Sequence, residues 1–300
     1  MSYYGQSMPP QRPQPPQISF QQMDAMIANN EGERLFNITR KCMIEIMWRH
    51  AAACYNFASK LGKVNADQKN AILLEGHEAA TSAYDAANET GEKTFDIVRW
   101  AAILSGEAVE IMDDQAGLEE AVKFKAYIAE GLTMSPQDFT LLHMRGRFSY
   151  EMAKLSWFER QGAESLFQGG PPPSYDDALG DFMLVDRLTQ GTWLENNLYI
   201  AKCYLGKKDK DNGVRYLRIA ERINPADDND WEQMMQVQKL LEKYSNGTCR
   251  KKEIEHYKKD QKNAPKIQAV STKNVKGGGG GKKSGFFNNL VQWGLDALDD

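Results

Sequence analysis

Long hydrophobic runs are missing from this chain of 300 residues. No stretch approaches the roughly 18–20 consecutive apolar residues that a membrane-spanning helix needs, and the mean hydropathy is −0.60. The N-terminal residues 1–20 are rich in proline and glutamine and contain no apolar segment of the kind that a secretory signal requires. We therefore expect no membrane span and a cytoplasmic location.

Cysteine is also scarce, with four residues at Cys42, Cys54, Cys203 and Cys249. They are scattered and form no C-x-x-C pair, so their spacing supports neither a disulfide framework nor a cysteine zinc site. A reducing compartment is the expectation that follows.

Groups that would support catalysis are few. The four histidines stand apart from one another, without the H-E-x-x-H spacing of a zinc enzyme. The aspartate pairs at 113–114, 176–177 and 227–228 come at predicted helix starts, where carboxylates cap free N–H groups. The run GGGGGKKS lacks both the glycine spacing and the preceding strand of a phosphate-binding loop. We expect a protein that is not an enzyme, with no catalytic residue, no cofactor and no metal ion.

Strand signals are almost absent, whereas apolar residues recur at helical spacing over most of the chain. Such runs cover residues 35–57, 72–87, 95–111 and 118–132. Glycine or proline follows or separates them, at Gly62, Gly91 and Pro136, as expected where helices end. The pattern predicts an all-α protein built from antiparallel helix pairs.

The helix pairs follow the register of a tetratricopeptide-like repeat, a helix pair of 34 residues with small residues where helices cross. Taking Pro136 and Pro225 as closing prolines places Gly146 at one small-residue position and Trp231 in a further helix. The same register assigns repeat positions to Ala178, Phe182, Ala201, Tyr204, Gly213, Leu217 and Ala220. We predict a repeat array, a solenoid of stacked helix pairs.

The register also predicts an insertion of 20 residues between Gly146 and Ala178, which extends the first helix of a pair and ends in a loop at 169–173. The expected organisation is a disordered segment at 1–20 and a repeat domain at 21–247. A flexible basic linker at 248–285, with one short helical stretch at its start, and an amphipathic helix at 286–300 follow.

Charge is distributed unevenly along the chain. Residues 250–283 contain eleven positive residues against three acidic ones, a net charge of +8, so the rest carries −12. The basic segment is either a solvated linker or an arm that docks on an acidic surface. Arginine is nearly absent from it and aromatic residues do not alternate with its lysines, so we expect no nucleic acid partner. The candidate contact residues are Lys251, Lys252, Lys258, Lys259 and Lys262.

A second candidate surface is the concave face that repeat arrays form from their first helices. The polar residues His143, Arg147 and Lys154 are expected there. The aromatic and methionine residues around Met144–Phe158 are either core between stacked helices or part of a peptide-binding face, and their periodicity favours core.

The segment from Leu141 to Phe182 resembles the signature of the regulator of microtubule dynamics family. His143, Gly146-Arg147-Phe148 and the run LSWFER correspond to that signature. So do the residues that follow, at Leu166-Phe167, the prolines 171–173 and Asp177-Ala178-Leu179. The resemblance extends over about residues 35–245, and it gives structural roles to Trp157, Arg160 and Phe167.

The resemblance implies a microtubule-associated protein that acts in spindle organisation and chromosome segregation, located on the cytoskeleton, at the spindle and its poles. Some family members carry an N-terminal membrane anchor, which the polar start of this chain does not resemble. The leading hypothesis is a protein that binds tubulin or partner proteins through its repeat surface, aided by the basic arm. The alternative is an adaptor that binds a peptide and reaches microtubules only indirectly.

Overall fold

The computed structural model describes residues 18–61, 65–155, 173–247 and 249–263. Within these ranges it contains eleven α-helices and no strand, so the predicted all-α class is confirmed. The helices are α1 (Phe20–Ala28), α2 (Gly32–Ala58), α3 (Ala66–Thr90), α4 (Phe95–Ile111), α5 (Asp114–Met134), α6 (Phe139–Lys154), α8 (Tyr175–Leu188), α9 (Leu194–Gly206), α10 (Lys210–Arg222), α11 (Asp228–Tyr244) and α12 (Lys251–Asn263).

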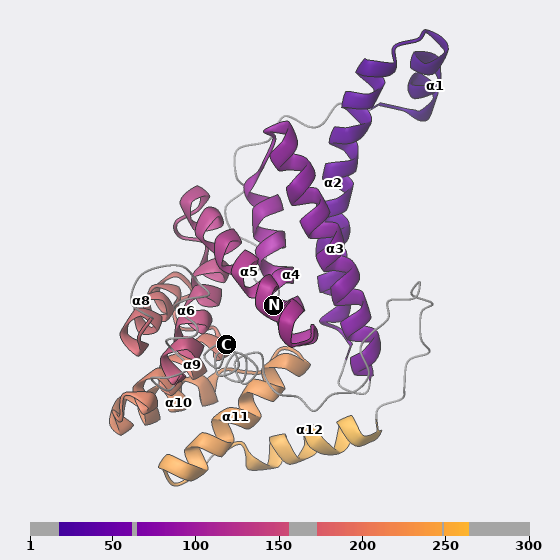
Figure 1. Ribbon diagram of the computed structural model, residues 1–300. Coiled ribbons are helices and arrows are strands. Elements are labelled where there is room, and N and C mark those ends of the chain that lie inside the picture. The colour runs from indigo at the N-terminus through magenta and orange to yellow at the C-terminus, as the bar shows by residue number, and fades with distance from the viewer. Residues whose placement is uncertain (1–17, 62–64, 156–172, 248, 264–300) are drawn as a thin grey trace.

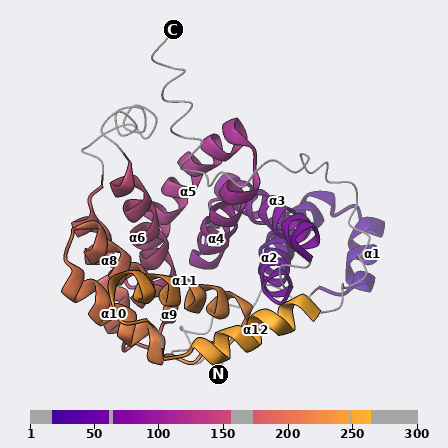
Figure 2. The same cartoon turned by 90° about the horizontal axis from the view of Figure 1, so that it is seen from below.

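Helices from α2 onward pack as consecutive pairs, namely α2–α3, α4–α5, α6–α8, α9–α10 and α11–α12. The stack curves, with α4 and α6 nearer its centre and α8 and α10 on its outer side (Figure 1, Figure 2). All four helical runs expected between residues 35 and 132 are present as α2, α3, α4 and α5. The helical-repeat architecture is therefore confirmed.

Helix ends follow the predicted local chemistry. Asp113 and Asp227 are N-caps whose carboxylates accept hydrogen bonds from backbone N–H groups three residues on. Asp177 forms a reciprocal capping box with Ser174 at the start of α8. Gly91 ends α3 in the left-handed conformation with φ 70°, which favours glycine. These aspartates serve as caps, as the sequence indicated.

Small residues bring the paired helices close together at the expected repeat positions. A Cβ atom on Gly146 would lie 2.7 Å from the ring of Phe182, so α6 and α8 depend on glycine there. The same holds for Gly213 of α10, where a Cβ would lie 2.7 Å from the Leu205 side chain. Buried alanines fill the other crossings, at Ala178, Ala201 and Ala220.

The other repeat positions occupy contacts of the same kind. Tyr204 stacks on Tyr216 with ring centroids 5.7 Å apart, and Pro225 lies in the turn between α10 and α11. These contacts fit the register read from the sequence, and the tetratricopeptide assignment itself stays an interpretation.

Helix α12 follows residue 247, the predicted end of the repeat domain, and contacts α11. The helix α12 docks on α11 through Ile254, which is fully buried, and Tyr257 stacks on Trp231 at 5.1 Å. The expected short helical stretch at the start of the basic segment thus runs to Asn263 and packs on the last helix before it. A buried isoleucine and one aromatic pair anchor it, a signal too short to stand out within the lysine-rich composition.

The insertion does not simply extend α6, which ends at Lys154 with Leu155 in extended conformation. The Leu155 side chain is buried in one cluster with Val109, Phe148 and Met152. Trp157, Arg160 and Phe167 lie outside the described residues. So do residues 1–17 of the predicted segment 1–20, residues 264–285 of the predicted linker 248–285, and the whole predicted helix 286–300.

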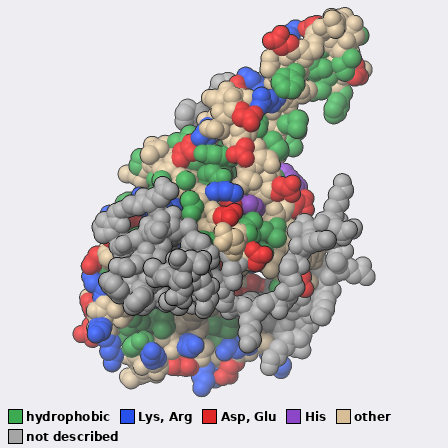
Figure 3. All heavy atoms as spheres, in the orientation of Figure 1, with side chains coloured by type: hydrophobic (Ala, Val, Ile, Leu, Met, Phe, Trp, Pro, Cys, Tyr) green, Lys and Arg blue, Asp and Glu red, His purple; other side chains and the backbone are tan. Residues whose placement is uncertain are grey.

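No helix in the described ranges has the length and apolar composition needed to cross a membrane. The end formed by α1 and the start of α2 projects from the array and shows hydrophobic side chains at its surface (Figure 3). Phe20, Ile27 and Phe36 are the most exposed of them near that end.

Candidate partner-binding site

The inner face of the array is formed by the first helices of successive pairs, α4, α6 and α9, which contact one another in that order; α4 and α6 lie nearer the centre in Figure 2. The sequence placed His143, Arg147 and Lys154 on such a face, one or two helical turns apart along α6. The structure brings Arg147 and Lys154 to it and places His143 beneath it.

His143 is 3% exposed and packs among aromatic rings. Its ring lies 4.2 Å from Trp193 and 5.3 Å from Phe182, measured between centroids. Its Nδ1 donates to Asn196 Oδ1 at 3.1 Å, and Asn196 Nδ2 donates to the carbonyl oxygen of Phe182 at 2.9 Å. His143 therefore links α6 to α8 and α9, and its contact with Glu195 helps to position that carboxylate.

Arg147 and Glu195 form the central ion pair of the inner face, with Arg147 Nη1 and Glu195 Oε1 3.5 Å apart. Burial acts to raise the pKa of Glu195, but the charge of Arg147 and the contact with His143 outweigh it and lower the pKa to about 2. Burial also acts to lower the pKa of Arg147, but the acidic groups of Tyr199, Glu195 and Glu107 hold it above its usual value. Both groups are charged at neutral pH.

Tyr199 lies at the middle of the inner face and contacts two cations. The Arg147 guanidinium lies 5.4 Å from its ring centroid and the Lys202 ammonium 4.2 Å. The ring of Tyr150 meets it edge-on at 5.4 Å, and the Lys154 ammonium lies 5.4 Å from the Tyr150 ring. These cation–π contacts hold Arg147, Lys202 and Lys154 in a row along the inner face.

Lys202 is the cation of this row that lies beside a neutral partner. Its Nζ donates to Gln236 Oε1 of α11 at 2.8 Å. Burial, together with the charges of Arg147 and Lys154, lowers the pKa of Lys202 to about 8 against the opposing effect of Glu195 and Glu151. An anion bound here would raise the pKa of Lys202 and so favour its charged form.

Across from these cations, α4 contributes two carboxylates, Glu107 and Glu110. Burial raises the pKa of both, while the charge of Arg147 acts to lower it. The inner face is therefore dipolar, with acidic groups on α4 and cations on α6 and α9. A ligand that carries both charges would match it.

The structure also places the predicted lysines of the basic segment. Lys251, Lys252, Lys258 and Lys259 are exposed on α12. Lys262 belongs to the same helix, and its side chain lies outside the described part. Because Ile254 and Tyr257 hold α12 against α11, these lysines stand on a fixed helix.

Sequence reasoning missed Glu195, Tyr199 and Lys202, which complete the inner face. The repeat register contained a usable signal, since Ala201 occupies the small-residue position of α9 as Gly146 does in α6. Residues at matching offsets from these two positions lie on matching faces of the two helices. Lys202 therefore corresponds to Arg147, the residue that was chosen.

Replacing Glu195 by glutamine is expected to lower the free energy of unfolding at pH 7 by about 1–3 kcal/mol, because a buried charged partner of Arg147 is removed. A carboxyl whose folded pKa is depressed stabilises the fold above its unfolded value of 4.5, and the effect is lost as pH falls toward 2. The difference between the two proteins should thus shrink over that window in urea titrations. Glu253→Gln, on the exposed face of α12, is the control, and equal pH dependence of wild type and Glu195→Gln would contradict the assignment.

Comparison with known proteins identifies a family whose members resemble this chain. The profile of regulator of microtubule dynamics protein 1-3 matches residues 19–245, which run from the cap of α1 to the end of α11. The chain is 31% identical over 199 residues to regulator of microtubule dynamics protein 1 of Caenorhabditis elegans, covering 66% of this chain and 84% of the relative.

Two vertebrate relatives match the same share of this chain. Protein 3 of Xenopus laevis and protein 2 of Homo sapiens, both named regulators of microtubule dynamics, are each 27% identical over 66% of this chain. The match covers 41% of the first and 47% of the second, so the chain spans less than half the length of either. Helix α12 lies beyond the matched region. With the family profile covering residues 19–245, from α1 to α11, the chain belongs to the regulator of microtubule dynamics family.

Proposed function

We propose that this protein is a non-enzymatic, microtubule-associated regulator of microtubule dynamics. In this proposal α12 contacts the acidic tails of tubulin, and the inner face of the array holds a partner protein. A role in spindle organisation and chromosome segregation, with a location on the cytoskeleton, is part of the same proposal. The names of its relatives support the microtubule connection.

The observation that carries the proposal is the lysine-bearing surface of α12. A flexible arm loses chain entropy when it binds, whereas a docked helix presents its charges without that cost. Four exposed lysines occupy nine residues of α12, while the rest of the chain outside the basic segment is acidic. A cationic surface on an acidic body orients the protein toward an anionic polymer.

Co-sedimentation of the full chain with polymer made from purified tubulin tests the proposal. We expect binding without any added partner, and weaker binding as the salt concentration rises, because salt screens exposed charges. A chain that stays in the supernatant at low salt would overturn direct association.

The dipolar inner face favours the second candidate, an adaptor that binds a peptide and reaches microtubules through it. Glu107 and Glu110 face Arg147 across the array, so a partner with charges of both signs fits the face better than a purely acidic tail. An adaptor of this kind would pellet only when its partner is added, which separates the two candidates.

If an anionic group binds beside Lys202, affinity for a short oligoglutamate peptide should fall as pH rises through about 8. The free lysine loses its proton there, and the bound anion holds the protonated form. Replacing Lys202 by methionine should flatten this pH profile and weaken binding at pH 7 by about two- to fivefold. Lys239→Met, an exposed lysine of α11, is the control, and an unchanged profile in Lys202→Met would reject Lys202 as the contact.

A further inference from the structure

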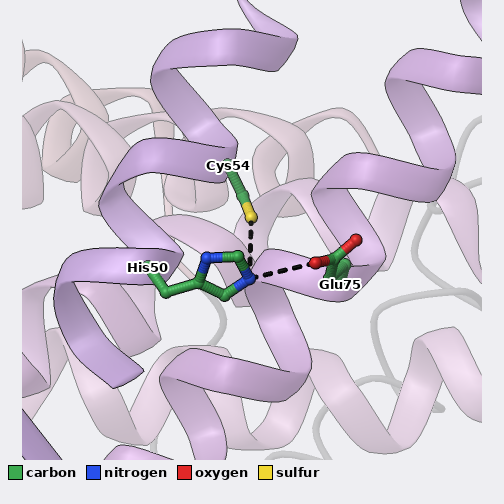
Figure 4. Close-up of side chains that lie close together, drawn as sticks. All are labelled: His50, Cys54 and Glu75. Atoms are coloured by element: carbon green, nitrogen blue, oxygen red, sulfur yellow. Dashed lines mark hydrogen bonds and ion pairs between the residues drawn. The ribbon is translucent and has the colours of Figure 1, made fainter. Parts of the chain in front are cut away.

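Three side chains with different donor atoms converge between α2 and α3 (Figure 4). His50 and Cys54 come from α2 and Glu75 from α3. His50 Nε2 lies 3.0 Å from Glu75 Oε1 and 3.6 Å from Cys54 Sγ. All three donor atoms lie within 4.8 Å of one another.

The local sequence explains why these atoms meet. His50 and Cys54 are four residues apart and so share one face of α2. Gly76, next to Glu75, lets α3 approach that face, because a Cβ there would lie 2.8 Å from Cys54 Cβ. The close approach of α3 to α2 thus places the Glu75 carboxylate beside His50 and Cys54.

The donor set matches the ligands of zinc, which binds imidazole nitrogen, thiolate sulfur and carboxylate oxygen in tetrahedral geometry. At the usual bond lengths such an ion holds its ligand atoms roughly 3.3–3.6 Å apart. The distances from His50 Nε2 to Glu75 Oε1 and to Cys54 Sγ are already near that range. A rotation of the half-exposed Glu75 carboxylate would bring its oxygen to the same distance from Cys54 Sγ.

We propose that His50, Cys54 and Glu75 bind a zinc ion that links α2 to α3, with water as the fourth ligand. His50 and Glu75 are open to solvent on one side, their side chains 48% and 46% exposed, so an ion and its water have access. Cys54 forms the buried floor of the site. The ion would join α2 to α3, the first helix pair of the array.

A cysteine beside a histidine can also be a catalytic pair, in which the histidine activates the thiol. Here burial and the nearby Glu75 carboxylate raise the pKa of Cys54 to about 11, whereas reactive cysteines have a lowered pKa. A bound cation supplies the positive charge that stabilises the thiolate. The raised pKa argues against a catalytic thiol, and the convergence of the three donor atoms is the observation that supports metal binding.

Cobalt(II) is the probe for this site, because a thiolate bound to cobalt gives a sulfur-to-metal charge-transfer band in the near ultraviolet. We expect the purified full chain to develop this band with one equivalent of cobalt and to lose it when zinc displaces the probe. Cys54→Ser should lose the band. Absence of the band in the wild-type protein, or its survival in Cys54→Ser, would overturn the proposal.

Matched cysteine variants identify the thiol. Cys249 is exposed and Cys42 lies on the same helix as the site, so Cys249→Ser and Cys42→Ser should keep the band. Loss of the band in Cys249→Ser, with Cys54→Ser unaffected, would assign the signal to adventitious binding. Circular dichroism confirms that each variant is folded.

His50→Ala provides an independent test, because its half-exposed side chain can be removed without opening the core. It should weaken cobalt binding at least about tenfold. Mutation of residues that only support a metal ligand already lowers metal affinity by about that factor. Zinc should raise the melting temperature of the wild-type protein and leave that of His50→Ala unchanged, since an ion that binds only the folded state stabilises it. Equal shifts in both proteins would contradict the site.

Discussion

Replacing Phe182 by alanine is expected to lower the free energy of unfolding by about 3–5 kcal/mol, the largest stability effect of any single change considered for this protein. Phe182 is fully buried at the crossing of α6, α8 and α9. Its ring lies against Gly146, 5.3 Å from the His143 ring and 5.5 Å from the Tyr199 ring. Truncation would remove this packing and leave a cavity under the inner face. Urea titration monitored by circular dichroism measures the loss.

Two further variants make this prediction specific to the crossing. Phe36→Ala removes the same ring from a site that is 60% exposed, and it should change stability by less than about 0.5 kcal/mol. Gly146→Ala alone overpacks the Phe182 ring, at an expected cost of about 1–3 kcal/mol. Combined with Phe182→Ala, the added methyl group enters the vacated space, so the double variant should be more stable than the sum of the single effects predicts. Strict additivity would show that the two residues are not in contact.

The helices of the array are readable from sequence because their signals are local. Caps such as Asp113 and Asp227, the stop at Gly91 and the apolar spacing of 95–111 each act within a few residues. The small residues Gly146 and Ala201 carried the repeat register, since a helix crossing has little tolerance for larger side chains there. Fold class and the order of helix pairs follow from these signals.

The site was harder to predict, because its residues combine through space. Periodicity placed His143 and Arg147 on one helix, yet it did not show that Trp193 and Phe182 from other helices would enclose the histidine. Glu195 is acidic and near a helix start, so it had the character of a solvated or capping residue. Its pairing with Arg147 depends on how α6 and α9 stack, and that is a tertiary contact.

Helix α12 changes how the basic segment should be tested. Ending the chain at Tyr244 would remove the lysines and would also uncover the surface of α11 that Ile254 and Tyr257 cover. Lost binding in that truncated chain would then have two explanations. Charge substitutions on the exposed face of α12 separate them, because they leave the docking residues in place.

Replacing Lys251, Lys252, Lys258 and Lys259 together by glutamate is expected to weaken association with tubulin polymer by roughly 5- to 1,000-fold at low salt. Each exposed ion pair contributes little by itself, but four contacts in one patch act together and the reversal adds repulsion. The variant should also lose the salt dependence of the wild-type protein, since the screened charges are the ones that were changed. The contribution of Trp231, which stacks on Tyr257, to the fluorescence of the six tryptophans is obtained by difference from Trp231→Phe and reports whether α12 is still docked.

A matched control separates the α12 surface from the net charge of the protein. Lys60, Lys125, Lys210 and Lys239 are exposed on four other helices or their ends, and reversing them changes the total charge by the same amount. If the α12 lysines are the contact, the control should keep most of its binding and its salt dependence, while the α12 variant stays in the supernatant. Equal losses in both variants would mean that only the overall charge attracts the polymer, and the assignment of α12 as the tubulin-facing surface would be wrong. Full binding by the α12 variant would instead leave the inner face as the surface through which this protein reaches microtubules.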